Sequence, residues 1–151
     1  MRKVIRGIVC LILASCTNST LVHQYETVDN DGWARADTIY FDLPAATETG
    51  DYGLSVAMRY ANSFPYEGIW IIAEGKMKKP TTHWRDTLYF RMADNEGIPM
   101  GHGVVVMQND TLVRTMHMQK GQNGSLRIWH IMRREVMPGV REVGIKVKRV
   151  N

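Results

Sequence analysis

Residues 54–60, with the sequence LSVAMRY, alternate apolar and mostly polar side chains from one position to the next. Successive side chains of a β-strand point to opposite faces, so this period of two predicts a strand with one buried face and one wetter face. The residues on the predicted buried face are Leu54, Val56, Met58 and Tyr60. From residue 36 onward a helical period is absent, and the sequence therefore predicts an all-β fold.

The same alternation recurs outward from this segment in both directions. Residues 38–43, 84–92 and 143–149 place apolar side chains on one parity. Their predicted buried residues are Ile39, Phe41, Leu43, Trp84, Leu88, Phe90, Met92, Val143, Ile145 and Val147. Residues 68–73 are apolar at both parities, which places them in a central strand. The residues expected to be nearly free of solvent are Trp70, Ile72, Phe90 and Ile145.

Residues 104–107, 111–119 and 126–132 read as further strands with less alternation. The polar triplet Gln108-Asn109-Asp110 between the first two predicts a tight hairpin. Turn signals rich in glycine, proline and asparagine separate the runs. About eight short strands at this spacing predict a single antiparallel β-sandwich, jelly-roll-like, over residues 36–151, with a closed barrel as the alternative.

Alternate loops of an antiparallel sandwich share an end, which predicts two groups of loops. One end would gather residues 61–66, 93–102 and 120–124. The other end would gather residues 44–52, 76–83, 109–110 and 133–140, with the basic side chains Lys76, Lys78, Lys79, Arg133 and Arg134. These cations are either separate solvated groups or a patch for acidic lipid headgroups, lipopolysaccharide or a protein.

The N-terminus has the order of a bacterial export signal. Its cationic residues are Arg2, Lys3 and Arg6. The uncharged run of residues 7–15 is shorter than the about 20 apolar residues that a bilayer span requires. Leu13-Ala14-Ser15-Cys16 resembles the bacterial lipobox, in which small residues precede a cysteine that accepts a diacylglyceryl group. We expect a cleaved signal peptide over residues 1–15 and a lipidated Cys16; an ordinary signal peptide with a coincidental cysteine is the alternative.

Residues 16–35 are polar and aperiodic, which predicts a lipidated tether with an end-to-end distance of about 25 Å. Cleavage would lower Lys+Arg from 19 to 16 against 15 Asp+Glu, so the mature net charge would be about +1. This balance does not favour nucleic acid as a partner. Thr17 follows the cysteine where an Asp would suggest the inner membrane, and no acidic run follows. We therefore expect outer-membrane anchoring with the domain facing the periplasm.

Several short motifs, in this order and spacing, carry a family resemblance. They are Trp33 with Asp37-Thr38-Ile39, then residues 59–66, 85–88, 92–97, 100–103, 130–133 and 143–145. Together they resemble the gliding-motility lipoprotein GldH family of Bacteroidetes. The resemblance implies a lipid-anchored envelope protein without assigned catalysis, linked to a gliding-type or secretion-type machinery. Its one transferable functional residue is Cys16.

Possible metal ligands and catalytic residues do not form a recognisable site motif in the sequence. Soft or borderline copper ligands are present at Met100, His102, Met116, His117 and Met118. On a strand, however, His117 points away from its two methionine neighbours, so no metal is expected. No nucleophile with a base stands out, and we expect a non-enzymatic protein without a cofactor.

We expect an accessory or scaffold that acts through contacts with other envelope proteins. The predicted contact loops hold large apolar side chains between turn residues. Their residues are Phe64, Pro65, Tyr66, Ile98, Pro99, Met100 and His102. A simpler account is that Phe64 and Met100 fold back and cap the sandwich. The alternative function is an envelope glycan-binding module, with Trp33 and Trp129 as aromatic platforms.

Overall fold

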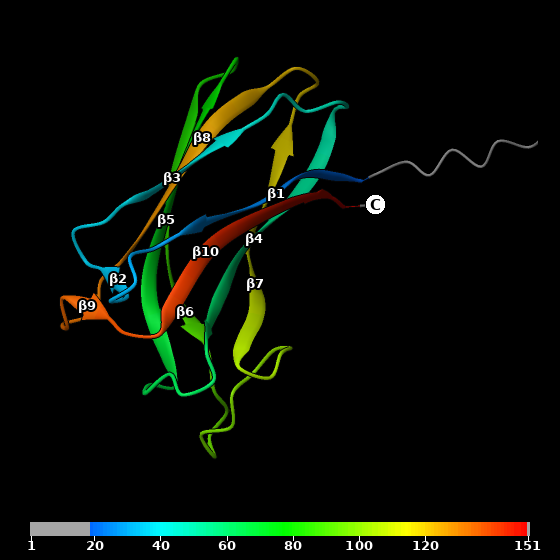
Figure 1. Cartoon of the computed structure of the whole chain (residues 1–151). Coiled ribbons are helices and arrows are strands. Elements are labelled where there is room, and N and C mark those ends of the chain that lie inside the picture. Colours follow the sequence, from blue (N-terminus) through cyan, green and yellow to red (C-terminus); the bar gives the residue numbers. More distant parts are fainter. Residues whose placement is uncertain (1–18, 151) are drawn as a thin grey trace, which may run out of the picture.

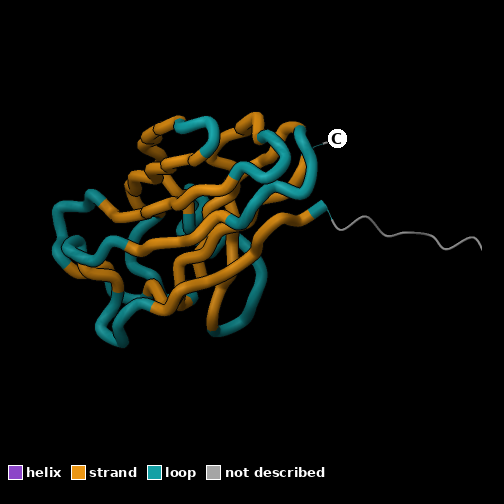
Figure 2. Tube along the Cα trace, turned by 90° about the horizontal axis from the view of Figure 1, so that it is seen from above, coloured by secondary structure: helices purple, strands orange, loops and turns teal. Residues whose placement is uncertain are grey.

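The computed structural model describes residues 19–150, which consist of strands and loops (Figure 1; Figure 2). The strands are β1 (Thr20–Thr27), β2 (Trp33–Ala34), β3 (Ile39–Leu43), β4 (Gly50–Ala61), β5 (Gly68–Lys78), β6 (Thr82–Arg91), β7 (Val106–Met118), β8 (Asn123–His130), β9 (Val136–Met137) and β10 (Val140–Arg149). They form sheets of order β1-β10-β4-β7 and β3-β8-β5-β6 and a ribbon of β2 with β9, all antiparallel. The prediction of an all-β fold is confirmed, and the sheets are arranged as in a sandwich.

One hydrophobic core lies between the two large sheets. Leu54, Val56, Met58 and Tyr60 of β4 are each at most 1% exposed, as their alternation predicts. The same parity rule buries the central residues of β10 and the core side of β3. Other core members are Phe41, Leu43, Ile69, Ile71, Phe90, Leu126, Ile128, Val143, Ile145 and Val147. Residues 19–150 include no helical segment with the length and hydropathy of a membrane span.

The register of β5 differs from the expectation. The strand is central, between β8 and β6, as predicted. Its core residues are Ile69, Ile71 and Ala73, whereas Trp70 is 48% exposed and Ile72 is partly exposed. The prediction that Trp70 and Ile72 are solvent-free is therefore wrong. Both faces of this strand are apolar in sequence, so alternation does not identify which face is buried.

Residues 106–118 form one strand, so the predicted hairpin at Gln108-Asn109-Asp110 is wrong. Asn109 pairs with Met58 and Asp110 with Ala57 inside the ladder between β7 and β4. Because β7 is the edge of its sheet, polar residues in mid-strand remain in contact with water.

Merging two predicted strands into one also shifts every later loop to the opposite end. Residues 120–124 lie with the β3–β4 loop, since Gly121 donates to the carbonyl of Ala46. The loop of residues 138–139 lies with the β4–β5 loop, because Ala61 donates to the carbonyl of Gly139. The predicted basic end is therefore wrong: its lysines lie on β5 and the β5–β6 hairpin, and its arginines follow β8 at the other end.

The structure begins the domain earlier than residue 36. Residues 20–27 form β1, which pairs with β10 through contacts such as Gln24 with Ile145. Trp33 is fully buried and its Nε1 donates to the carbonyl of Asp37 at 3.0 Å. The expectation of a tether through residue 35 is therefore wrong from Thr20 onward. An edge strand with one wet face has a polar and irregular sequence, which conceals it from a search for apolar alternation.

Candidate functional site

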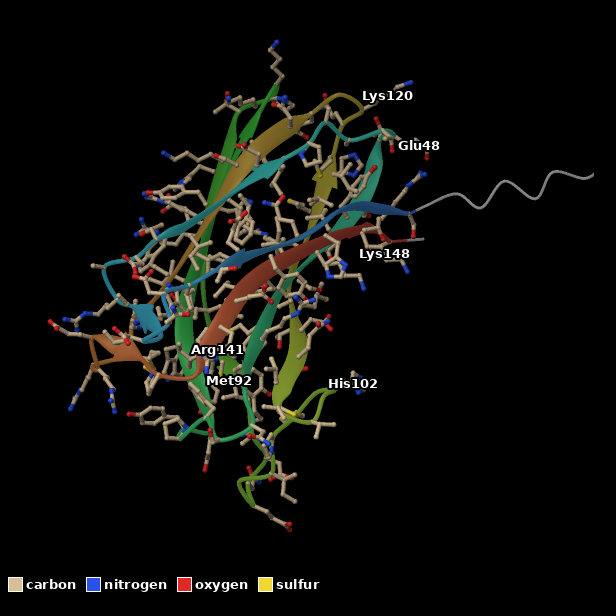
Figure 3. The ribbon with its side chains drawn as sticks, in the orientation of Figure 1. Glu48, Met92, His102, Lys120, Arg141 and Lys148 are labelled. Atoms are coloured by element: carbon tan, nitrogen blue, oxygen red, sulfur yellow. The ribbon has the colours of Figure 1, made fainter. Side chains whose placement is uncertain are left out.

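The two ends of the sandwich are occupied by different loops (Figure 3). Glu48 and Lys120 lie in loops at the end where β1 begins, which we call the Ser19 end. Met92 and His102 lie in the β6–β7 loop at the opposite end, which we call the Met92 end. The β4–β5 loop and the connections around β9 share the Met92 end, because their backbones are hydrogen-bonded to one another.

The β6–β7 loop concentrates exposed apolar side chains. Val104 is 83% exposed and Val105 is 71% exposed. A valine side chain in water contributes almost nothing to the stability of the fold. The exposed apolar residues of the loop and of the β7 start, which we call the loop valine set, are Ile98, Met100, Val104, Val105 and Val106. The sequence predicted a strand over residues 104–107, whereas the structure begins β7 at Val106 and leaves Val104 and Val105 in the loop.

Hydrogen bonds within the β6–β7 loop fix its shape. The Asp94 carboxylate accepts the backbone N–H groups of Glu96 and Ile98, each at 2.9 Å. His102 and Gln108 exchange two backbone hydrogen bonds of 2.8 and 2.9 Å. Gly103 has φ of 140° beside the carbonyl of Val106, a conformation and a clearance that only glycine tolerates. The exposed valines are therefore presented by an ordered loop.

The β4–β5 loop lies directly against the β6–β7 loop, as the sequence analysis expected. Asn62 donates its side-chain N–H to the carbonyl of Val104 at 2.8 Å and its backbone N–H to the carbonyl of Val105 at 3.0 Å. The Tyr60 hydroxyl lies 2.8 Å from the carbonyl of Met92 and 2.5 Å from that of Met100. Burial raises the pKa of Tyr60 to about 12, so this hydroxyl remains a donor.

The predicted contact residues divide between packing and exposure. Phe64 packs edge-on against Tyr60 and Tyr66, with ring centroids 6.0 and 5.7 Å apart. It therefore caps the core, as the simpler account proposed. The Tyr66 hydroxyl accepts a hydrogen bond from Arg134 at 3.2 Å. Pro65, Ile98, Met100 and His102 are exposed, Tyr66 and Pro99 are partly buried, and Cys16 lies outside the described residues.

A second surface covers the outer face of the sheet β3-β8-β5-β6. Trp70 and Tyr89 are cross-strand neighbours with ring centroids 5.2 Å apart. A groove beside Trp70 is lined by Tyr66, Ile131, Met132, Arg133 and Arg134. Trp33, expected as a possible platform, is in the core and cannot serve as one, whereas Trp129 is partly exposed on this face.

Glu74 forms the centre of a charged cluster on the same face, which sequence patterning did not reveal. Its carboxylate is 2% exposed and accepts hydrogen bonds of 2.7 Å from Nε of Arg85 and of Arg127, while His83 lies 3.4 Å away. Burial opposes ionisation, but hydrogen bonds from Arg85, Arg127 and His83 outweigh it and lower the pKa of Glu74 to about 2. The carboxylate thus holds the Cζ atoms of Arg85 and Arg127 at 5.6 and 5.3 Å from the centroid of the Trp129 ring.

The side chain of His130, a histidine of the resemblance motifs, has structural partners. His130 is buried, its Nε2 lies 3.0 Å from the Trp33 carbonyl, and its ring meets the Trp33 ring edge-on. Burial lowers the pKa of His130, which keeps the ring neutral. Residues 19–150 hold no group of three His, Cys, Asp or Glu side chains placed to bind a metal ion. Met100 and His102 lie at the other end of β7 from Met116–Met118.

Comparisons with known proteins agree with the motif resemblance. The chain is 24% identical over 150 residues to the gliding motility lipoprotein GldH of Flavobacterium johnsoniae, covering 92% of this chain and 91% of that protein.

Among solved structures, a ruminal GH26 endo-β-1,4-mannanase matches with a TM-score of 0.40 and 12% identity over 79% of this chain and 19% of its own. A Sulfurospirillum deleyianum protein matches with a TM-score of 0.44 and 10% identity over 86% of this chain and 98% of its own. Both TM-scores are below 0.5, so neither likeness bears on function. The family model described as GldH lipoprotein matches residues 20–147, and the chain therefore belongs to the GldH lipoprotein family.

Proposed function

We propose that the protein is a lipid-anchored, non-enzymatic accessory of an envelope machinery that works through protein contacts made by the loop valine set. The relative in Flavobacterium johnsoniae is named for gliding motility, which supports a role in a gliding-type assembly. Cys16 would carry the lipid, with the domain on the periplasmic side of the outer membrane. The lipobox pattern of residues 13–16 supports this anchoring.

The observation that carries the proposal is the exposure of the loop valine set on an ordered loop. Soluble domains seldom expose several large apolar side chains in one connection unless a partner covers them. Hydrogen bonds from Asn62 and Tyr60 already fix the loop, so binding would not lose the conformational entropy of ordering it. Methionine and aromatic residues, which are present at this end, are favoured in interface cores.

Site-specific photo-crosslinking in the native bacterium tests the contact. A photoreactive amino acid at Val105 should give discrete protein adducts in the envelope. The matched control is the same amino acid at Thr47, which is exposed at the Ser19 end. A Val105→Asp substitution should remove the adducts formed from a reporter at Ile98 while the melting temperature stays the same. Adducts of equal yield at Thr47 and Val105, or none at Val105, would contradict the proposal.

The anchor is tested separately by mass spectrometry of the native protein. The mature N-terminal peptide should begin at Cys16 and carry acyl chains, because the lipobox predicts cleavage before Cys16 and acylation of this residue. Two acyl chains suffice for stable membrane attachment. Cys16→Ala should yield an unprocessed or unacylated species that behaves differently on membrane flotation. An unmodified Cys16 in the native protein would refute the anchor.

A second function, binding of an envelope glycan, is favoured by one specific observation. Trp70 is 48% exposed, lies beside Tyr89 and borders a groove with two arginines, an arrangement suited to stacking against a sugar ring with anionic groups. Polysaccharide purified from the same outer membrane should bind the protein, and Trp70→Ala should weaken binding at least about tenfold. Val105→Asp should leave this binding unchanged. Equal affinity of the Trp70→Ala variant would exclude the groove.

A further inference from the structure

The described chain begins at the corner where β1 meets the end of β10. The Arg149 N–H donates to the Ser19 carbonyl at 2.7 Å, and Thr20 pairs with Lys148. Cys16 therefore precedes the first hydrogen-bonded residue of the domain by three positions. Three fully extended residues span at most about 11 Å. β1 itself spans about 26 Å away from this corner, at about 3.3 Å per residue, so Cys16 cannot reach the Met92 end.

Unpaired lysines lie at the same end of the sandwich as this corner. The β7–β8 loop lies against the β3–β4 loop through a hydrogen bond of 3.0 Å from the Lys120 N–H to Oγ1 of Thr49. It lies against the β5–β6 hairpin through Nε2 of Gln122, which donates to the Pro80 carbonyl at 3.0 Å. These contacts bring the exposed lysines Lys78, Lys79 and Lys120 to the Ser19 end, where the exposed Lys148 of β10 pairs with Thr20. Within residues 19–150, none of the four is ion-paired.

The nearby carboxylates do not neutralise these lysines. Glu48 is paired with Arg149, and Asp51 lies 2.8 Å from Nδ1 of His117. Figure 3 shows Glu48 and Lys148 beside the start of β1 and Lys120 farther along the same end of the sandwich. The Ser19 end therefore presents a net positive surface at the point from which the chain leads toward Cys16.

We propose that the Ser19 end is a membrane-facing surface whose four lysines lie against the anionic headgroups of the bilayer that holds the lipid. The inference rests on the lipidation of Cys16 proposed above. Lysines near a negatively charged bilayer are attracted to it over about one Debye length, which is about 8 Å at physiological ionic strength. A tether of three residues spans at most about 11 Å, which holds the surface at a distance comparable to this Debye length. The domain is thus oriented, and the loop valine set points away from the bilayer.

Headgroup quenching in reconstituted vesicles tests the orientation. The full chain is expressed so that it is processed and lipidated, and is then placed in vesicles of phosphatidylcholine with or without phosphatidylglycerol. The sequence has two cysteines, Cys10 in the signal and Cys16 at the anchor, so a single added cysteine can carry a fluorophore. Reporters are placed at the exposed positions Thr47, at the Ser19 end, and Glu96, at the Met92 end. The quencher is a lipid labelled in its headgroup.

The reporter at Thr47→Cys should be quenched more strongly than the reporter at Glu96→Cys, and phosphatidylglycerol should increase the difference. Raising the salt concentration to 1 M, where the Debye length falls to about 3 Å, should reduce this increase. Replacing the four lysines by glutamate should abolish the effect of phosphatidylglycerol, while replacing them by arginine should preserve it. The control is Arg133→Glu with Arg134→Glu at the Met92 end, which should change nothing.

The outcomes separate the inference from the anchor on which it rests. Equal quenching at both reporters in a protein that is lipidated by mass and floats with the vesicles would overturn the orientation and leave the anchor intact. A difference that does not respond to phosphatidylglycerol or to the glutamate variant would overturn the role of the lysines. A protein without lipid on Cys16 would refute both the anchor and the orientation.

Discussion

The two ends of the sandwich are closed by different chemistry. At the Ser19 end, the side chain of the buried Gln122 accepts a hydrogen bond from the Gln119 N–H and donates to the Pro80 carbonyl, so a polar side chain ties the β7–β8 loop to the β5–β6 hairpin. At the Met92 end, the aromatic rings of Trp33 and Tyr60 fill the space beneath longer loops. The polar closure leaves a charged rim, whereas the aromatic closure leaves an apolar rim. The difference supports the proposals that the Ser19 end faces the bilayer and that the Met92 end contacts a protein.

Trp33→Ala should produce the largest effect, because it removes the buried ring that fills the Met92 end. We expect a loss of about 3–5 kcal/mol in the free energy of unfolding, the usual cost of a large cavity. Trp70→Ala is the matched control and should cost far less, since half of that side chain is in water. Urea denaturation of both variants measures the difference. Equal losses would mean that the buried and exposed tryptophans have been assigned incorrectly.

Gln122→Ala and Tyr60→Phe compare the closures directly. Each removes a buried polar group and leaves a backbone partner without its hydrogen bond, which costs about 1–3 kcal/mol. Hydrogen exchange should locate the damage: Gln122→Ala should speed exchange in the β5–β6 hairpin and the β7–β8 loop, and Tyr60→Phe in the β6–β7 loop. Faster exchange at both ends in either variant would show that the ends are not independent.

Glu74 lies between the ends, and its titration should affect stability without distinguishing them. Its folded pKa of about 2 is below the ordinary 4.5, so its contribution is complete above 4.5 and is lost as the pH falls toward 2. The wild type should exceed Glu74→Gln in stability at neutral pH, and the gap should narrow over that interval. Urea unfolding at several pH values checks this. A gap that is constant with pH would show that the carboxylate does not titrate as its partners imply.

Val104→Ser with Val105→Ser should have the smallest effect on the fold. Both side chains are mostly in water, so the free energy of unfolding should change by no more than about 0.5 kcal/mol. Thermal melting checks the stability of the double variant. A loss of several degrees in the melting temperature would place these valines in the core and remove the main argument for a contact surface at the Met92 end.

Sequence patterning predicted the strands whose two faces differ. In β4 and β10 one parity is apolar and the other is not, so periodicity identified both the strand and its buried face. It failed in β5, where both parities are apolar, and in β1 and β7, where an edge position permits polar residues. The Glu74 cluster could not be predicted, because its three charged members come from three strands and their meeting depends on register.

The candidate site was located in part for a similar reason. Turn residues identified the β4–β5 and β6–β7 loops. Their shared end was predicted correctly because both loops precede the hairpin that was wrongly predicted at residues 108–110. The valines at residues 104–106 were assigned to a strand, since three apolar residues in a row read the same in a buried strand and on an exposed loop. Exposure depends on what the other loops leave uncovered, which no local pattern records.

The direction of β1 has a mechanical consequence. The strand enters at the Ser19 end and runs along the edge of its sheet toward the Met92 end, antiparallel to β10. Hydrogen bonds of an antiparallel ladder are perpendicular to the strands. A pull on the lipid proposed at Cys16, resisted by the partner proposed at the Met92 end, would therefore act along β1 and load its ladder in shear, with all bonds strained together. An anchor attached at Thr27 would instead peel the same bonds apart one pair at a time.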